Sequence, residues 1–330
     1  MNNYLITWFY AEKKEDESFY PSVGGNTSSP EYQKVYWRCV YDFYRTAQLT
    51  QKKSNAKYLF FTNVPNIPTD IDGLNLAQFF YDANVEIKQL ELTNRTPKDW
   101  YGAWRNQFYL FDVLEYLKNR YDGNFLVLDS DIFITQDLSN VFYDIEKYQI
   151  ISYDCGYRED VSINGISIQQ MRQLVVKFNG GGDGSKLRYK GGELIGLRSD
   201  ILPGLLKCYS ELWKFNYKRY EEKQVKLNEE AHFLSIIYHQ LGFDDSIANK
   251  YIKRMWTAVK CDNIVAGDEN LPLWHLPAEK KYAFEKMFDF LCKSHTEEEY
   301  INWLRKMLDI PGSKYIRMLK KCVAKINEKF

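Results

Sequence analysis

The sequence predicts an α/β protein with a mainly parallel mixed sheet flanked by helices, followed by a helical C-terminal extension. Short apolar runs typical of strands alternate with segments of helical spacing as far as about Gly242, which favours a parallel sheet with both faces covered. One of these runs, Asn124–Thr135 (NFLVLDSDIFIT), carries two carboxylates within a strongly apolar segment. The C-terminal segment 283–330 has the apolar spacing of helices instead.

The first half of the chain supplies its strands and helices in regular alternation. Strands are expected at Tyr4–Tyr10, Lys57–Val64, Val85–Leu92 and Asn124–Thr135. Helices are expected at Glu31–Thr50, Leu74–Tyr81 and residues 104–114. A Gly/Ser/Asn-rich loop, Ala11–Pro30, directly follows the first strand, and a long loop at this place is either functional or mobile.

The second half is less regular. A short helix at Asp137–Ile145 and a strand at Tyr148–Tyr153 are followed by Gly156–Lys190, which has no clear period. A returning strand at Gly191–Leu197 then precedes two helical segments, expected near Asp200–Glu222 and Glu229–Leu241.

Composition excludes several classes of protein. The 330 residues are 45% hydrophobic, enough for a sizeable core, and 44 Lys+Arg balance 44 Asp+Glu, so no global field attracts nucleic acid. Six cysteines lack CxxC spacing, which favours a reducing compartment over a zinc site or a disulfide framework. No apolar run approaches a membrane span, and the N-terminus is too polar for a signal peptide. A cytoplasmic location is therefore expected.

Asp129 and Asp131 are the strongest functional signal. Two carboxylates at the end of a buried strand are costly unless a partner or a metal compensates them. At i and i+2 on an extended backbone they point to the same side, about 6–7 Å apart, so one divalent cation with its phosphate ligands fits between them. Because parallel sheets bind ligands outside the carboxyl ends of their strands, this position suits a catalytic centre.

The segment FLVLDSDIFI resembles the DxD strand of nucleotide-sugar-dependent glycosyltransferases of the GT-A type. The most similar group contains glycogenin and bacterial lipopolysaccharide galactosyltransferases. The resemblance implies a Rossmann-like nucleotide-binding half, with Asp129 and Asp131 as ligands of Mn²⁺ (or Mg²⁺) and with Asp129 and Ser130 beside the nucleotide. Independently of the family, a divalent ion neutralises the charge that develops on a departing diphosphate.

A third metal ligand is implied late in the chain, where LWHLPAEKK resembles the family's His-containing segment. His275 is the candidate ligand, and Lys280 or Lys281 would pair with the diphosphate. Ala278 stands where the family commonly has Gly. The alternative is a partly buried structural histidine beside Trp274.

The resemblance also places the end of the first strand at the nucleotide. Thr7, Trp8, Phe9 and Tyr10 would approach it, with Tyr10 stacking on the base, although alternation turns half of these side chains toward the core. Arg105 lies where the family has a basic residue for donor sugar and phosphate, and a guanidinium suits such contacts. A surface salt bridge is its alternative.

Gly191 and Gly192 resemble the glycine segment that lines the sugar pocket in this family, because glycine lets the backbone approach a ligand closely; an ordinary strand entry is the alternative. Glu193 follows directly and is a candidate catalytic residue. Lys186, Arg188 and Lys190 would either cover the phosphates as a mobile lid or be solvated.

Glu229 and Glu230 open a helix and resemble an acidic pair placed beside the acceptor. A carboxylate there could act as the base in an inverting enzyme, or bind sugar hydroxyls or stabilise positive charge in a retaining one. Acidic residues also suit a first helical turn for electrostatic reasons. With His232, Glu229 spells one ExxH motif, but no second copy completes a di-iron set.

These signals predict a metal-dependent glycosyltransferase that moves a sugar, most simply from a UDP-sugar, to a glycan or glycosylated acceptor, in bacterial surface polysaccharide or glycoprotein glycan synthesis. The expected catalytic domain is 1–282, with a nucleotide half at about 1–135 and an acceptor half at about 136–282. Two alternatives stay open: a nucleotidyl- or phosphotransferase that uses the same acidic pair, and a non-catalytic carbohydrate-binding module.

The C-terminal extension contains two predicted helices. Thr296 and Glu299 form a capping box that opens a helix through Leu308. After Pro311-Gly312, the last helix has an apolar face of Ile316, Leu319, Val323 and Ile326 and a basic face of Lys314, Arg317, Lys320, Lys321, Lys325 and Lys329. Such a helix can lie on an anionic membrane as a peripheral contact at its inner face. The alternative is a packed terminal helix whose basic face is solvated.

Overall fold

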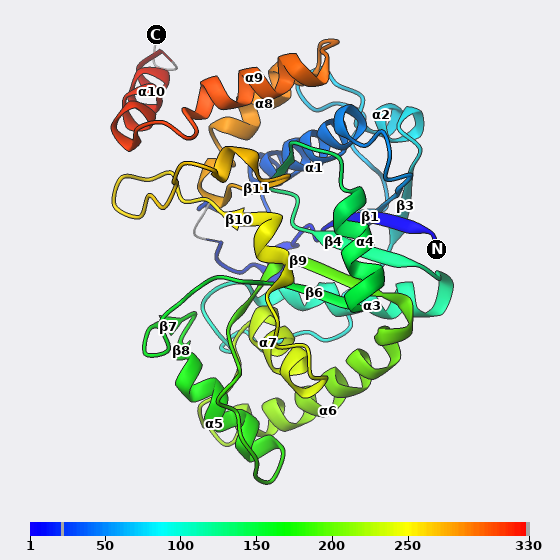
Figure 1. The fold of residues 1–330 in the computed structure, drawn as a ribbon, viewed down its shortest axis with the longest axis vertical. Helices are drawn as coiled ribbons and strands as arrows, with labels where there is room; N and C mark the ends of the chain where they lie inside the picture. Colours follow the sequence, from blue (N-terminus) through cyan, green and yellow to red (C-terminus); the bar gives the residue numbers. More distant parts are fainter. Residues whose placement is uncertain (21–22, 328–330) are drawn as a thin grey trace.

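The computed structural model describes residues 1–20 and 23–327, and its centre is a six-stranded mixed sheet (Figure 1). The sheet has the order β3-β2-β1-β4-β9-β6. Its strands are β1 (Asn3–Phe9), β2 (Lys57–Thr62), β3 (Val85–Gln89), β4 (Asn124–Leu128), β6 (Ile150–Asp154) and β9 (Lys190–Arg198). Strands β1 to β4 are parallel, and β9 runs antiparallel to its neighbours β4 and β6.

A second, three-stranded sheet has the order β10-β11-β5. It contains β10 (Ile252–Arg254), β11 (Leu273–His275) and β5 (Ile132–Ile134). The single strand expected over Asn124–Thr135 is therefore divided. β4 pairs with β1 and β9 in the first sheet, whereas β5 pairs with β11 in the second. Asp129, Ser130 and Asp131 form the link between the two sheets.

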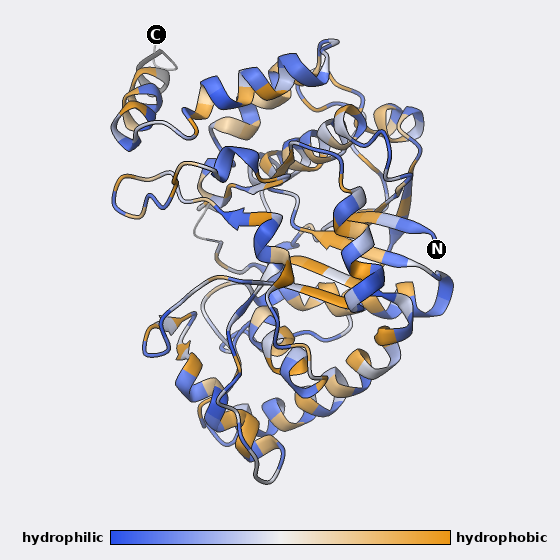
Figure 2. Ribbon diagram, in the orientation of Figure 1, coloured by the Kyte–Doolittle hydropathy of each residue, from blue (hydrophilic) through white to orange (hydrophobic). Residues whose placement is uncertain are grey.

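Helices cover both faces of the large sheet, and two core clusters follow the alternation of its strands. On one side lie α1 (Pro30–Thr50), α2 (Leu76–Asp82), α4 (Ser139–Tyr148), α8 (Ala283–Leu291) and α9 (Glu297–Leu308). On the other lie α3 (Tyr109–Arg120), α5 (Ile168–Phe178), α6 (Leu202–Glu221) and α7 (Glu230–Gln240). In β1, Leu5 points into the first cluster and Ile6 into the second. Figure 2 shows the hydrophobic strands at the centre of these layers. The predicted α/β class is confirmed.

The segment Gly156–Lys190, which has no clear period, contains a short hairpin and a helix. The hairpin strands are β7 (Ser162–Ile163) and β8 (Ile166–Ser167), and α5 follows directly. Ser167 and Gln170 form a complete capping box at the start of α5, and the helix buries Ile168, Met171, Leu174 and Val175. Both signals are present in the sequence, but the glycines that follow α5 obscured them.

The capping box of Thr296 and Glu299 is present at the start of α9, as predicted. Helices α8 and α9 belong to the same core cluster as α1, so the start of the C-terminal extension is packed against the α/β body. No helix of the described residues has the length and the apolar composition needed to cross a membrane.

The last helix, α10 (Lys314–Asn327), packs against the protein with a basic face and exposes its large apolar side chains. An ordinary packed helix does the reverse. Arg317 is only 3% exposed, while large apolar side chains on α10 are exposed: Tyr315, Ile316, Met318, Leu319 and Val323. The interpretation as a packed helix with a solvated basic face is therefore wrong, because basic residues bind the body through ion pairs. Ile326, Lys325 and Lys329 lie outside the residues whose side chains the structure describes.

Candidate active site

One deep pocket lies at the carboxyl end of β1 and β4 and encloses about 1100 Å³ of space, including its open mouth. Residues from both sheets and from the Ala11–Pro30 loop form its walls. The lining residues are Trp8, Phe9, Tyr10, Glu12, Tyr20, Tyr32, Tyr36, Trp104, Gln107, Asp129, Ser130, Asp131, Asn164, Tyr189, Gly192, Glu193, Glu229, Glu230, Ala231, Arg254, Trp256, His275, Pro277 and Lys280. Distant parts of the sequence thus meet at the predicted acidic centre.

Asp129 and Asp131 are held at the junction of the two sheets by their own backbone. The Asp129 N–H donates to the Glu193 carbonyl (3.1 Å), which continues the β4–β9 ladder. The Leu276 N–H donates to the Asp131 carbonyl (3.1 Å), which continues the β5–β11 ladder. Because each aspartate belongs to the end of a different sheet, the position of one sheet against the other sets the spacing of the two carboxylates.

His275, at the end of β11, completes a possible cation site. One ligand atom from each of Asp129, Asp131 and His275 lies within 4.8 Å of the others. Two ligands on one first-row or magnesium-sized cation, each about 2.0–2.2 Å from it, are separated by up to about 4.4 Å. A small closure of the three side chains would therefore satisfy a divalent ion. Carboxylate ligands suit Mg²⁺, Ca²⁺ and Mn²⁺, and an imidazole ligand suits Zn²⁺ and Fe²⁺.

Without a cation, positive side chains neutralise these acids. Lys280 forms an ion pair with Asp131, and His275 Nε2 lies 3.3 Å from Asp131 Oδ2 and 3.9 Å from Asp129 Oδ2. Burial alone lowers the pKa of His275, but Asp131 and Glu193 outweigh it and raise the pKa to about 9. A metal-binding imidazole must be neutral, so a cation would displace this proton.

The two aspartates have opposite pKa shifts. Burial, together with the neighbouring Asp131 carboxylate, raises the pKa of Asp129 to about 6. Burial also acts to raise the pKa of Asp131, but Lys280 and His275 hold it well below its ordinary value. Asp129 is also the more accessible, with its side chain 31% exposed against 5% for Asp131. Of the two carboxylates, Asp129 is therefore the one open to an incoming ligand.

Glu193 lies behind the cation site and orients it. Its buried carboxylate accepts from Arg254 Nε (2.8 Å) and Nη2 (2.6 Å) and lies 3.3 Å from His275 Nδ1. Burial acts to raise the pKa of Glu193, but Arg254 and His275 outweigh it and lower the pKa to about 2. A carboxylate on the far nitrogen of a metal-binding histidine fixes the ring and its tautomer. Glu193 is thus placed to orient His275, and its predicted catalytic role stays a prediction.

Glu229 and Glu230 have different roles although they are adjacent. Glu229 accepts from Asn164 Nδ2 and from the Tyr189 hydroxyl (2.9 Å), and His232 Nε2 is 3.3 Å away. Oε2 of Glu230 is buried and has no hydrogen-bond partner. Burial and the nearby Glu229 and Asp129 carboxylates raise the pKa of Glu230 well above its ordinary value. Glu230 is the carboxylate of this pair that remains available to a ligand.

Residues predicted to approach the nucleotide are divided between pocket and core. Trp8, Phe9 and Tyr10 line the pocket, whereas Thr7 is fully buried and its hydroxyl donates to the Leu128 carbonyl (2.8 Å). Gly192 also lines the pocket, and a Cβ there would lie 2.6 Å from Glu230 Oε1. Gly191 precedes Gly192, and a Cβ on Gly191 would lie 2.0 Å from Glu193 Oε2. Both glycines allow the carboxylates to pack against β9.

Arg105 is not among the residues that line the pocket. Its guanidinium donates to the carbonyls of Asp16 (3.0 Å) and Glu17 (3.2 Å), so it holds the loop after β1. Of the two candidate lysines, Lys280 enters the pocket and Lys281 is exposed. The basic residues near the start of β9 have different partners: Arg188 pairs with Glu159, and Lys190 donates to Ser246 and to the Asp244 and Asp245 carbonyls.

Several pocket residues were not predicted from the sequence. They are mainly aromatic: Tyr20, Tyr32, Tyr36, Trp104, Tyr189 and Trp256, together with Gln107 and Arg254. The chain contains 26 Tyr, so aromatic character alone carried no signal. Trp104 adopts a left-handed backbone conformation (φ 51°), which is uncommon for a bulky residue and marks functional or strained sites. This turn also explains why the helix expected from residue 104 begins later.

The sheet order, the antiparallel β9 and the acidic link after β4 define an α/β fold of the GT-A type. No family model matches the sequence, and no curated protein matches it. Among solved structures, the bifunctional glycosyltransferase WbbM is similar, with a TM-score of 0.53 and 8% identity over 91% of this chain and 51% of that chain. Mouse xyloside xylosyltransferase 1 aligns with a TM-score of 0.46 and 9% identity over 84% and 98% of the respective chains. This chain thus spans about half of WbbM, and the likeness concerns the fold.

The contacts of Glu193 generate a prediction about cation binding. Glu193→Gln removes the charge that Arg254 and His275 share, so affinity for Mn²⁺ should fall by about 10–100-fold, as for other residues that orient a metal ligand. Isothermal titration calorimetry with Mn²⁺ measures this. Glu159→Gln is the matched control, because Glu159 also pairs with two arginines but does not line the pocket. Equal Mn²⁺ affinity for wild type and Glu193→Gln would show that Glu193 does not orient the site.

Proposed function

We propose that this chain is a metal-dependent glycosyltransferase that transfers a sugar from a UDP-sugar to a glycan or glycosylated acceptor, with Mn²⁺ (or Mg²⁺) as cofactor. One observation carries the proposal: Asp129, Asp131 and His275 converge beside Lys280 in a pocket of about 1100 Å³ at the carboxyl edge of a GT-A sheet. When bound, the cation would neutralise the charge that develops on the departing diphosphate.

The protein's own residues would bind and orient the donor around that centre. Trp8 and Tyr10 offer aromatic surface for the base at the end of β1. Ser130 lies in the pocket wall beside Asp129 and offers a hydroxyl to the ribose or phosphates. Lys280, which pairs with Asp131, would be free to bind a phosphate oxygen if a cation compensated the Asp131 charge. Roles for Thr7, Gly191 and Arg105 stay predictions, and the donor contact for Arg105 would require it to leave the Asp16 and Glu17 carbonyls.

Glu230 is proposed to act on the sugar or the acceptor hydroxyl. Its carboxylate lies beside Gly192 and has a free oxygen in a largely buried setting. A raised pKa suits a group that accepts or returns a proton near neutral pH. Glu229 supports this wall of the pocket through Tyr189 and Asn164.

The narrower parts of the proposal concern substrate and context. We propose a hexosyl donor, a nucleotide half at 1–135 and an acceptor half at 136–282, and a cytoplasmic role in bacterial surface polysaccharide or glycoprotein glycan synthesis. A relationship to the group of glycogenin and the lipopolysaccharide galactosyltransferases belongs to the same proposal. It is supported by the DxD segment and by the order of the motifs along the chain.

Removing the acidic pair tests the metal assignment. Asp129→Asn combined with Asp131→Asn should reduce hydrolysis of the bound UDP-sugar by at least about 10³-fold, because a main electrostatic stabiliser is lost. A panel of sugar nucleotides with Mn²⁺ supplies the assay. Asp99→Asn, on an exposed residue, is the control. Hydrolysis that survives the double substitution would remove the metal assignment, and wild-type protein that binds no nucleotide diphosphate with Mn²⁺ would leave the binding-module alternative.

Glu230 is tested by separating binding from catalysis. Glu230→Gln keeps the shape of the side chain but cannot exchange a proton, so kcat should fall by about 10²–10⁴-fold. Calorimetric affinity for UDP with Mn²⁺ should remain within about threefold, because the nucleotide lies at the β1 side of the pocket. A kcat within tenfold of wild type would exclude Glu230 from the chemical step.

We also propose peripheral membrane contact through α10. Its exposed Ile316, Leu319 and Val323 lie on a helix that also carries the partly exposed Lys314 and Lys320, a combination that favours an anionic lipid surface. Figure 2 shows hydrophobic and hydrophilic residues alternating along this helix, which lies at the edge of the molecule.

Substitution of the exposed apolar face tests this contact. Ile316→Ser combined with Leu319→Ser should reduce flotation with vesicles containing anionic lipid by at least about tenfold. The reason is that the double variant has less apolar area to bury in the lipid. Tyr143→Ser removes an even more exposed large side chain from α4 and serves as control. Unchanged flotation, or flotation equal on neutral vesicles, would contradict the proposal.

A further inference from the structure

Two basic residues of α10 connect this terminal helix to the wall of the pocket. Arg317 and Lys321 are one helical turn apart and therefore lie on the same face. Arg317 is 3% exposed and forms an ion pair with the buried carboxylate of Asp262. Lys321 forms an ion pair with Glu279, which is fully buried. Paired charges at this depth require well-defined geometry, since unpaired ones would be costly.

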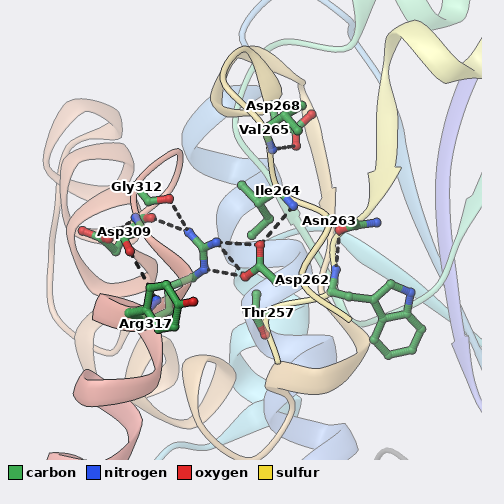
Figure 3. A network of polar contacts seen from close by, with 12 residues as sticks. Thr257, Asp262, Asn263, Ile264, Val265, Asp268, Asp309, Gly312 and Arg317 are labelled. Atoms are coloured by element: carbon green, nitrogen blue, oxygen red, sulfur yellow. Dashed lines mark hydrogen bonds and ion pairs between the residues drawn. The ribbon is translucent and has the colours of Figure 1, made fainter. Parts of the chain in front are cut away.

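Arg317 joins three segments of the chain (Figure 3). Its Nε and Nη2 donate to Asp262 (3.0 and 2.6 Å), and Nη1 donates to the carbonyls of Asp309 (2.8 Å) and Gly312 (3.0 Å). The turn after α9, the start of α10 and the loop that follows β10 are thus fastened at one guanidinium. The planar, forked shape of arginine makes this arrangement possible.

The loop fastened by Arg317 carries Trp256 into the pocket. Asn263 follows Asp262. Its Oδ1 accepts from the backbone N–H of Trp256 (2.9 Å), and its Nδ2 donates to the Arg254 carbonyl (2.8 Å). Trp256 and Arg254 both line the pocket. Asn263 therefore transmits the position of the Asp262 anchor to the pocket wall.

Lys321 fastens a second point of the same wall. Besides its ion pair with Glu279, its Nζ donates to the Thr257 hydroxyl (2.9 Å), and that hydroxyl donates to Glu279. Thr257 directly follows Trp256, and Glu279 directly precedes Lys280. One buried cluster thus holds the neighbours of two pocket residues that come from different segments.

We propose that α10 is a brace for the candidate active site, and that Arg317 and Lys321 are positioning residues that hold Trp256 and Lys280 where a nucleoside diphosphate binds. The inference rests on the proposed function, and it assigns to the C-terminal helix a task separate from any membrane contact. The exposed apolar face and the buried basic face of α10 use different side chains, so the two tasks can be separated by mutation.

The experiment measures UDP affinity in the presence of Mn²⁺ by calorimetry on the full-length protein. Lys321→Met should weaken UDP binding by about tenfold, and Thr257→Val, which breaks the same link without changing a charge, should weaken it in the same direction. Lys321→Arg should restore most of the affinity. Lys314→Met is the matched control, since it removes a lysine of α10 that contacts neither anchor, and it should bind UDP like wild type.

A double-mutant cycle with Trp256→Ala shows whether the brace acts through the pocket wall. If it does, Lys321→Met should weaken UDP binding by about threefold in the Trp256→Ala background rather than about tenfold, because only its effect on Lys280 then remains. Additive effects would overturn the inference, as would full affinity of Lys321→Met and Thr257→Val. In both cases UDP binding by the wild type would leave the proposed function unaffected. Wild-type protein that binds no UDP would instead refute the proposed function and the brace together.

Hydrogen exchange adds a readout that does not depend on UDP. In Lys321→Met, amides of residues 256–263 should exchange faster while those of β1 and β4 keep their protection. Unchanged exchange over 256–263 would contradict the brace even if the variant lost affinity.

Discussion

The structure depends on how two acidic side chains are neutralised at the junction of two sheets. Asp129 and Asp131 lie where β4 leaves one sheet and β5 enters the other, and both lie against apolar strands. Buried carboxylates need positive partners, and here His275 and Lys280 supply them. A divalent cation could take over the same task, so the arrangement that stabilises the fold also forms a candidate cation site.

A second layer of charges holds that arrangement in place. Glu193 joins His275 to Arg254, so β9, β10 and β11 share one buried ionic cluster. Farther out, Glu279 and Thr257 join the same wall to α10 through Lys321. Charge compensation therefore runs from the cation site to the C-terminal helix. Each of these ion pairs joins residues that are distant in sequence.

Elements whose patterns are local could be predicted from the sequence. Apolar runs predicted β1, β2 and β4, and the Thr296–Glu299 box predicted the start of α9. Helix α5 was not predicted, because neighbouring glycines obscured its capping box. At the site, Asp129, Asp131 and His275 are brought together as expected. The aromatic wall was not predicted, since many Tyr residues serve equally well in a core.

The sequence by itself determined the α/β class and the position of the acidic pair, because strand periodicity and carboxylates in an apolar run are properties of neighbouring residues. Only the tertiary structure decided which partner each charge takes. It directed the Arg105 side chain to carbonyls of the loop after β1 rather than into the pocket, and it left Oε2 of Glu230 unpaired while Glu229 is hydrogen-bonded. It also turned the basic side of α10 inward, toward Asp262 and Glu279. The physical reason is that ion pairing depends on distances in space, which sequence spacing does not contain.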